Sequence, residues 1–197
     1  TVSRVRDPDK QSALMDIIQD DVKRLDRLIS DISDASRLDA ELARGQMESV
    51  DLGKLLAALV QAHRTAAEGR TGDAQSAAIV FSGQQAGCIV RGIEGRLVQV
   101  FQNLISNARS FTPLGEQIVL AVRRDGRDVV ITVEDRGPGI PVESLDSIFE
   151  RFYSERPEGE SFGRHSGLGL SISRQIVEAH GGTIHAENVQ NNDGRRI

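Results

Sequence analysis

The sequence predicts an α+β fold, a two-layer α/β sandwich in which helices cover one face of a mixed sheet, preceded by one long helix. Three observations carry this prediction. Helical and strand-like segments are mixed from residue 50 onward, apolar residues recur at sevens over residues 10–44, and an Asp-Gly pair at 125–126 separates two strand-like segments. The composition, 39% hydrophobic and 27% charged, is that of an ordinary globular protein.

Charge and composition argue against several classes of function. The net charge is −5 and no block of Lys and Arg occurs, so nucleic-acid binding has no support. Cys88 is the only cysteine, which excludes an internal disulfide framework. No apolar run is long enough to span a membrane. We therefore expect no membrane contact of this chain. Because it begins at Thr1 and stops at Ile197, just after the turn-like NNDG, we interpret it as a soluble fragment of a larger protein.

Residues 10–44 predict one long helix with a coiled-coil-like seam, ending at Gly45. A single helix cannot hide such a seam, so we expect it to pack on a partner helix or, alternatively, on the globular part of this chain. The seam has two rows spaced by seven residues, Leu14, Leu28, Ala35 and Leu42 in one and Ile18, Leu25 and Ile32 in the other.

The rest of the chain alternates between helices, strands and loops. Asp51 is a candidate N-cap for a helix over residues 50–67. Polar, glycine-containing segments at 68–77 and 154–167 are predicted loops. Further helices are predicted over 94–111, 142–153 and 168–180, and strands over 77–81, 88–91, 118–124, 128–134 and 183–187.

The stretch VEDRGPGIP at 133–141 is a candidate ligand site. Asp135 directly follows the predicted strand 128–134, so its direction is fixed. Gly137 and Gly139 let the backbone turn sharply and approach another group closely. The stretch is either an ordinary turn or the floor for a flat ligand, with Asp135 accepting a hydrogen bond from that ligand.

Two asparagines on the predicted helix 94–111 form a second candidate. Asn103 and Asn107 lie one turn apart on the same helix face, and Gln99 continues the row. An amide oxygen is a suitable ligand for a hard cation such as Mg²⁺. The alternative is a solvated helix face.

Glycines and phenylalanines near residues 149–169 supply a third candidate. Gly167 and Gly169 precede an amphipathic helix, where a glycine-rich entry offers free N–H groups to phosphates. This is not the Rossmann fingerprint, because no strand leads into it. Phe149 and Phe152 are either core residues or anchors of a lid formed by residues 154–166.

In this order, the motifs resemble the ATP-binding domain of the Bergerat fold, which sensor histidine kinases, DNA gyrase, Hsp90 and MutL share. The resemblance covers residues 50–197, and the long helix resembles the second helix of a kinase dimerisation hairpin. We therefore expect a partial dimerisation region at 1–47 and a catalytic ATP-binding domain at 48–197. The matching motifs are NLISNA (N box), DRGPGIP (G1 box), FERFY (F box), SGLGLSI (G2 box) and HGGTI at the closing helix–strand junction.

The resemblance implies a site for ATP and Mg²⁺. Asp135 would accept a hydrogen bond from the adenine amino group, with Gly137 and Gly139 letting the base lie against the loop. Asn107 would coordinate Mg²⁺, and Asn103 would assist at the phosphates. Gly167 and Gly169 would offer backbone N–H groups to the phosphates. The remaining expected nucleotide-binding residues are Ile140, Phe149, Phe152, Leu168, Leu170, Arg109 and Ser110.

Three positions depart from the family pattern: Ser110, Phe111 where Tyr is frequent, and His165 where the G2 box often begins with Gly. Ser110 stands where many relatives carry a lysine that contacts phosphate. Arg109 either compensates for that lysine or is a surface charge. His165 and Arg156 lie in the expected lid, where each is either a functional group or an ordinary loop residue.

The resemblance favours kinase chemistry over hydrolysis. The hydrolytic members carry a water-activating glutamate where this chain has Asn103, and an amide cannot act as a general base. We therefore expect a protein-histidine kinase. None of the four histidines fits the acceptor context, so the acceptor is expected upstream and the fragment should not autophosphorylate by itself. These histidines are His63, His165, His180 and His185.

The family also implies partners and a location. We expect a response regulator that receives the phosphoryl group on an aspartate, a homodimer formed through the hairpin, and the cytoplasmic portion of an inner-membrane bacterial sensor. NARSF, RPEGESFG and LGLSISRQIVEAHGG are similar to alphaproteobacterial ChvG-type kinases. The alternatives are a hydrolytic ATPase of the same fold and a non-catalytic nucleotide-binding module that regulates a partner.

Overall fold

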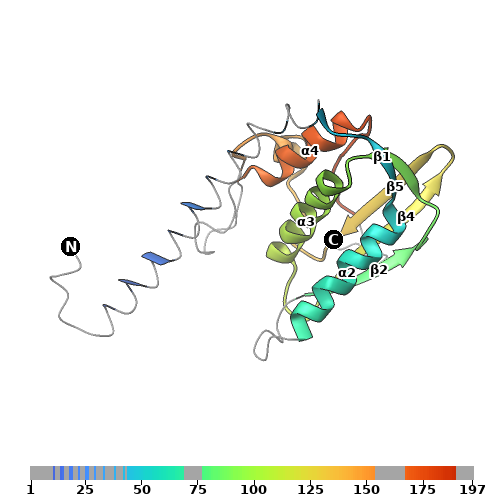
Figure 1. Cartoon of the computed structure of the whole chain (residues 1–197). Coiled ribbons are helices and arrows are strands. Elements are labelled where there is room, and N and C mark those ends of the chain that lie inside the picture. Colours follow the sequence, from blue (N-terminus) through green and yellow to red (C-terminus); the bar gives the residue numbers. More distant parts are fainter. Residues whose placement is uncertain are drawn as a thin grey trace.

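The computed structural model describes residues 44–68, 77–153 and 167–189, together with single positions between residues 11 and 42 (Figure 1). No helix of this described part is long and apolar enough to cross a membrane. In chain order the elements are β1 (Glu48–Asp51), α2 (Leu52–Glu68), β2 (Ala78–Gly83), β3 (Ile89–Gly92), α3 (Glu94–Phe111), β4 (Gln117–Asp125), β5 (Asp128–Glu134), two 3₁₀ turns (Val142–Ser144 and Ser147–Phe149) and α4 (Gly169–Ala179).

The described strands form two sheets. In the larger one, β4 lies between β2 and β5, parallel to β2 and antiparallel to β5, so the sheet is mixed as predicted. The β4–β5 hairpin turns at Gly126, whose φ of 61° is the left-handed conformation that the Asp-Gly signal anticipates. β1 and β3 pair antiparallel in a separate two-stranded sheet.

Helices and the larger sheet share one hydrophobic core. Figure 1 shows α2 and α3 on the same side of the sheet, and this arrangement confirms the predicted sandwich. Alternate residues of β4 point into the core, as period-two strand geometry requires, and each helix contributes one apolar face. Core residues from these elements include Ile118, Leu120 and Val122 of β4, Leu56 of α2, Leu97, Phe101 and Ile105 of α3, and Ile172 and Ile176 of α4.

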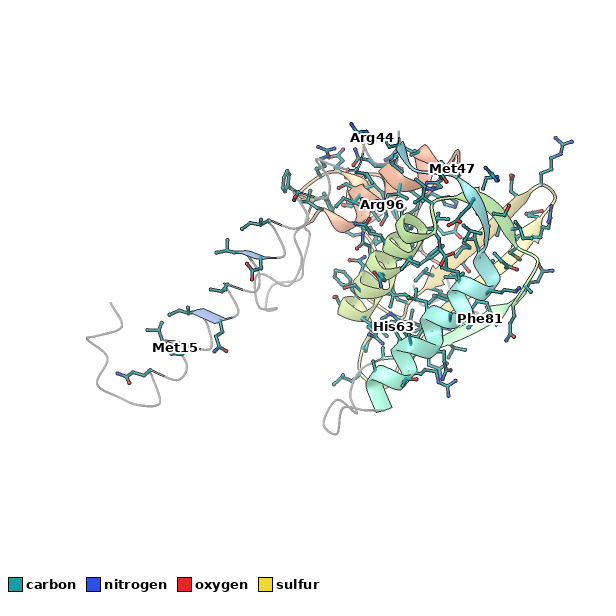
Figure 2. The ribbon with its side chains drawn as sticks, viewed as in Figure 1. Met15, Arg44, Met47, His63, Phe81 and Arg96 are labelled. Carbon is teal, nitrogen blue, oxygen red and sulfur yellow. The ribbon has the colours of Figure 1, made fainter. Side chains whose placement is uncertain are left out.

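Among the described positions of the N-terminal helix, those near its end pack on the globular part and most of those before them are exposed. Its described positions are helical up to Arg44 and the helix ends before Gly45, as predicted. Leu38 is fully buried in the core cluster and Leu42 packs against that cluster. In contrast, Met15, labelled in Figure 2, lies away from the sheet and is 49% exposed. The exposed apolar residues of this helix are Met15, Ile18, Val22, Leu25 and Ile29; Leu28, Ile32 and Ala35 of the predicted seam lie outside the described residues.

β1 is not expected from the sequence, which instead predicts that a helix opens at residue 50. Residues 48–51 form a strand because they pair with β3, a partner far along the chain. Asp51 ends this strand and still caps α2: its Oδ1 accepts hydrogen bonds from the N–H groups of Gly53 and Lys54, at 3.1 and 3.4 Å. Its Oδ2 accepts a further hydrogen bond from Gly87 at 2.9 Å.

Cys88 precedes β3 and lies at the junction between the two sheets. Its side chain is fully buried, and its Sγ donates a hydrogen bond of 3.3 Å to Oε1 of Gln84. Its carbonyl oxygen accepts the N–H of Leu52, the first residue of α2, at 2.9 Å. Gln84 Oε1 also accepts the N–H of Arg124 on β4, at 3.3 Å. The cysteine therefore belongs to the packing of the fold.

Two other predicted elements are wrong in type. The sequence predicts one helix over residues 142–153, but they form two short 3₁₀ turns, because Pro141 and the glycines before it set a loop path. It also predicts a strand over residues 183–187, yet the structure assigns none there. The segment alternates between exposed and half-buried residues as a strand would, but a strand also needs a backbone partner.

Candidate functional site

Asn103 and Asn107 lie on one flank of α3, as predicted from their spacing. Asn103 Nδ2 donates hydrogen bonds to the Gly169 carbonyl at 3.1 Å and to Ser173 Oγ at 3.4 Å. Ser173 is fully buried, and its hydroxyl donates to the same Gly169 carbonyl at 2.8 Å. Asn103 therefore braces α3 against the first turn of α4, and Asn107 lies half-buried one turn further along α3.

The G-x-G motif is placed beside this flank of α3. A Cβ atom on Gly169 would lie 3.6 Å from Asn103 Cγ, which is ordinary contact. Gly167 has a φ of 70°, and a Cβ there would come within 2.9 Å of the Tyr153 carbonyl oxygen. Leu168 is buried and Leu170 is half-buried in the first turn. α4 begins at Gly169, so its first N–H groups lack partners within the helix. They lie at the end of α4 that Asn103 contacts.

The loop after β5 is held by its own aspartate. Asp135 Oδ1 accepts the N–H of Gly137 at 2.7 Å, and among the described residues Oδ2 of Asp135 has no hydrogen-bond partner. A Cβ on Gly137 would lie 2.7 Å from Asp135 Oδ1 and 3.1 Å from Phe111 Cβ, so the loop runs close to the end of α3. Gly139 has a φ of 79°, which favours glycine. One carboxylate oxygen thus shapes the loop and the other can accept a donor from a ligand.

The far end of this loop borders an open hollow of about 320 Å³, lined by residues 138–143. Ile140 lies in this lining, and its backbone is hydrogen-bonded to Asn188. Neither Asp135 nor Asn107 contributes to the hollow. It therefore extends the loop surface outward and does not by itself join the loop to α3.

The two phenylalanines that the sequence pairs have different roles. Phe149 is buried, and the Arg174 guanidinium of α4 lies 6.0 Å from its ring centroid. Phe152 is 64% exposed and has a φ of 66°, an unusual backbone conformation for a non-glycine residue. Its N–H donates to the Gly167 carbonyl at 3.0 Å. Residues 154–166, with Arg156 and His165, lie outside the described residues.

Arg109 does not join the asparagine row. It projects from the flank of α3 that faces α2, where it lies near His63. Its Nε is buried and has no hydrogen-bond partner among the described residues. Figure 2 shows His63 on α2, next to the end of α3. Ser110 is on the asparagine side, and its hydroxyl donates to the Ser106 carbonyl of the same helix at 3.0 Å. The expected contact of Arg109 or Ser110 with the nucleotide stays a prediction.

The His63–Arg109 pair predicts a pH-dependent stability. Burial lowers the pKa of His63 below its usual 6.5, and the positive charge of Arg109 lowers this pKa further. The unfolded chain then binds more protons than the folded chain as the pH drops through about 6.5, so the free energy of unfolding should fall with the pH. Urea unfolding at pH 7.5, 6.5 and 5.5 should show a smaller fall for His63→Gln. The exposed His185, changed to Gln, is the control and should retain the wild-type slope.

His180 joins the end of α4 to the start of α3. Its Nε2 accepts the N–H of Ile93 at 3.0 Å, which requires the ring proton on Nδ1, and Nδ1 donates to the Ile176 carbonyl at 2.7 Å. A Cβ on Gly92 would lie 2.9 Å from the His180 ring, so the contact is tight. Through these contacts His180 has a structural role at the junction of the two helices.

Replacing His180 by alanine is expected to lower the free energy of unfolding by about 2 kcal/mol, because it leaves the Ile93 N–H unpaired and removes one of the two hydrogen bonds that the Ile176 carbonyl accepts. Chemical denaturation followed by circular dichroism measures this loss. His185→Ala is the matched control. A His180→Ala variant as stable as the control would show that the two hydrogen bonds contribute nothing.

The sequence does not single out Ser173 or Asn188. Each contacts a predicted site residue: Ser173 contacts Asn103, and Asn188 contacts Ile140. Their side chains are ordinary in type, and nothing in the local sequence marks them. No group of three or more His, Cys, Asp and Glu side chains that could hold a metal ion occurs in the described part of the chain.

Comparisons with known proteins agree with the predicted fold. The family described as "Histidine kinase-, DNA gyrase B-, and HSP90-like ATPase" matches residues 92–197. Sensor protein ChvG of Rhizobium meliloti (strain 1021) is 52% identical over 99% of this chain and 34% of its own length. Sensor protein ChvG of Agrobacterium fabrum is 47% identical, over 96% of this chain and 32% of its own length. The chain thus spans about a third of these relatives.

Two solved structures have a similar fold. Full-length ShkA, crystallised in complex with AMPPNP, matches with a TM-score of 0.69 and 25% identity, over 95% of this chain and 37% of that one. The catalytic domain of histidine kinase ThkA matches with a TM-score of 0.58 and 27% identity, over 74% of this chain and 90% of that one.

Proposed function

Because this chain belongs to the family of histidine kinase-, DNA gyrase B- and HSP90-like ATPases, we propose that it is the ATP-binding catalytic part of a sensor histidine kinase. The observation that carries the proposal is Asp135 at the end of β5. One of its carboxylate oxygens fixes the loop and the other has no partner among the described residues. A carboxylate in this position selects a base that presents an N–H donor, as adenine does.

The nucleotide would span from this loop to the start of α4. Gly137 and Ile140 would contact the base, and the first N–H groups of α4 would bind phosphate oxygens, since a helix N-terminus favours negative charge. Asn107 would offer an amide oxygen to Mg²⁺, and this ion would neutralise developing charge on the phosphates. The half-buried position of Asn107, one turn from the braced Asn103, fits this assignment.

Transfer to a histidine, rather than hydrolysis, is supported by Asn103. Its amide cannot take a proton from water, and its Nδ2 is already hydrogen-bonded to Gly169 and Ser173. Catalysis in phosphoryl transfer rests mostly on positioning and charge stabilisation, which a braced, neutral side chain is able to support. Asn103 would therefore act by keeping α3 and α4 in register at the phosphates.

The acceptor histidine would lie outside residues 1–197. His180 uses both ring nitrogens in backbone hydrogen bonds, so it cannot accept a phosphoryl group without losing them. His63 is half-buried beside Arg109. The relatives are about three times as long as this chain, and we propose that the whole protein acts on a response regulator as a homodimer, with this part in the cytoplasm.

The proposal is tested by calorimetric titration of the chain with a non-hydrolysable ATP analogue and Mg²⁺, followed by a phosphate-release assay with ATP. Saturable binding together with negligible phosphate release is the expected result. Fast release would favour a hydrolytic ATPase. Absence of binding by a folded chain would contradict the proposal and leave a regulatory role that does not use the nucleotide. If the chain binds the analogue as expected, incubation with ATP should yield phosphohistidine only when a separate polypeptide that carries the acceptor helix is added.

A further inference from the structure

The segment after α4 is attached to the loop at residues 135–141 by one side chain. Asn188 Oδ1 accepts the Ile140 N–H at 2.9 Å, and Asn188 Nδ2 donates to the Ile140 carbonyl at 2.7 Å. Both polar atoms of the side chain therefore serve a single residue of the loop. This pairing reproduces what a neighbouring strand would offer, in a segment where no strand forms.

Only an amide side chain can make this pair of contacts. It carries one acceptor and one donor on the same planar group, whereas a carboxylate carries acceptors alone and a hydroxyl has a single atom. Asn188 is half-buried, so the two contacts are partly removed from water. An aspartate at this position would place a negative oxygen against the Ile140 carbonyl.

The loop has few other places at which its backbone could be held. Pro138 and Pro141 have no N–H to donate, and Gly139 adopts a left-handed conformation with a φ of 79°. Asp135 holds the near end of the loop through the Gly137 N–H. Asn188 holds the far end at Ile140, so the stretch from Gly137 to Ile140 is fixed at both ends.

We propose that Asn188 is a positioning residue of the nucleotide site, an inference that rests on the proposed function. It acts where the base binds. By holding Ile140, it keeps the backbone of the loop in the position in which a flat base can lie against it and donate a hydrogen bond to Asp135. The phosphate side, on α3 and α4, is braced separately by Asn103 and Ser173. The effect of Asn188 should therefore depend on the base and not on the phosphates.

The experiment compares wild type, Asn188→Ala and Asn188→Asp, with Glu187→Gln as the matched control at the exposed neighbouring position. Amide hydrogen exchange at Ile140 reports the clamp directly. Calorimetric titration with ATP and, separately, with inorganic triphosphate reports the two sides of the site. A thermal melt of each variant identifies a general loss of folding.

We expect the Ile140 amide of Asn188→Ala to exchange about tenfold faster and its ATP affinity to fall about tenfold, since two hydrogen bonds are lost. Triphosphate affinity should not change, and Glu187→Gln should match wild type. Asn188→Asp should be at least as impaired as Asn188→Ala. An equal loss for ATP and triphosphate would indicate a merely structural role and overturn the proposal.

Unchanged exchange at Ile140 would also overturn the proposal, whatever the affinities. If wild type itself fails to bind ATP, the proposed function is wrong. In that case the Ile140 exchange rate still decides whether Asn188 holds the loop.

Discussion

Replacing Asp135 by asparagine is expected to weaken ATP binding about 100-fold, because a charged acceptor for the adenine amino group is replaced by an amide whose nitrogen faces that donor. The amide oxygen of asparagine can still accept the Gly137 N–H, so the loop should keep its shape. Calorimetric titration with ATP measures the loss. A thermal melt should show a change of only a few degrees.

A change of base sharpens this prediction. Inosine triphosphate presents a carbonyl oxygen where ATP presents its amino group, so wild type should bind it poorly and Asp135→Asn should bind it better than wild type does. Asp128→Asn, at the exposed start of the same strand β5, is the matched control and should retain wild-type affinity for both nucleotides. Equal losses for both nucleotides in Asp135→Asn would count against a direct contact with the base.

Replacing Gly83 by alanine is expected to lower the free energy of unfolding by about 3 kcal/mol, the sum of backbone strain and a steric clash. Gly83 ends β2 with a φ of 102°, and a Cβ there would lie 2.2 Å from the Val122 carbonyl oxygen of β4. That oxygen also accepts the Gln84 N–H at 3.1 Å, so it cannot move away cheaply. Urea unfolding followed by circular dichroism measures the loss.

Two other glycines separate the strain from the clash. Gly87 has a φ of 87° but open space where a Cβ would lie, so Gly87→Ala should cost only about 1 kcal/mol. Gly95 lies in α3 with open space and no left-handed φ, so Gly95→Ala should raise stability by about 0.5 kcal/mol. If Gly83→Ala costs no more than Gly87→Ala, the parallel β2–β4 pairing is looser than described.

Elements whose signals are local were predicted correctly from the sequence. The β4–β5 hairpin follows from Asp125-Gly126 between two apolar runs, and α3 and α4 follow from helical periodicity. β1 depends on its pairing with β3. The parallel pairing of β2 with β4 joins one strand that precedes α3 in the sequence to one that follows it. Neither pairing leaves a mark in the residues of one strand alone, because the partner supplies the hydrogen bonds.

The same distinction applies to the site. The positions of Asn103, Asn107 and Asp135 on their elements were predictable from spacing and from the end of a strand. The partners of these residues were not. Asn103 meets Ser173 across 70 residues of sequence, and Asn188 meets Ile140 across 48. Such contacts depend on how α3, α4 and the loop pack, which a one-dimensional pattern does not specify.

Because Cys88 is buried, the rate at which its thiol is alkylated can report local opening of the fold. A thiolate must reach solvent to be alkylated, and Cys88 is 0% exposed, with its own backbone carbonyl accepting the first N–H of α2. Since the sequence has one cysteine, every alkylation event records an opening of the packing around this single thiol. When reclosing outpaces the reagent, the alkylation rate measures the population of that open form, without any introduced label.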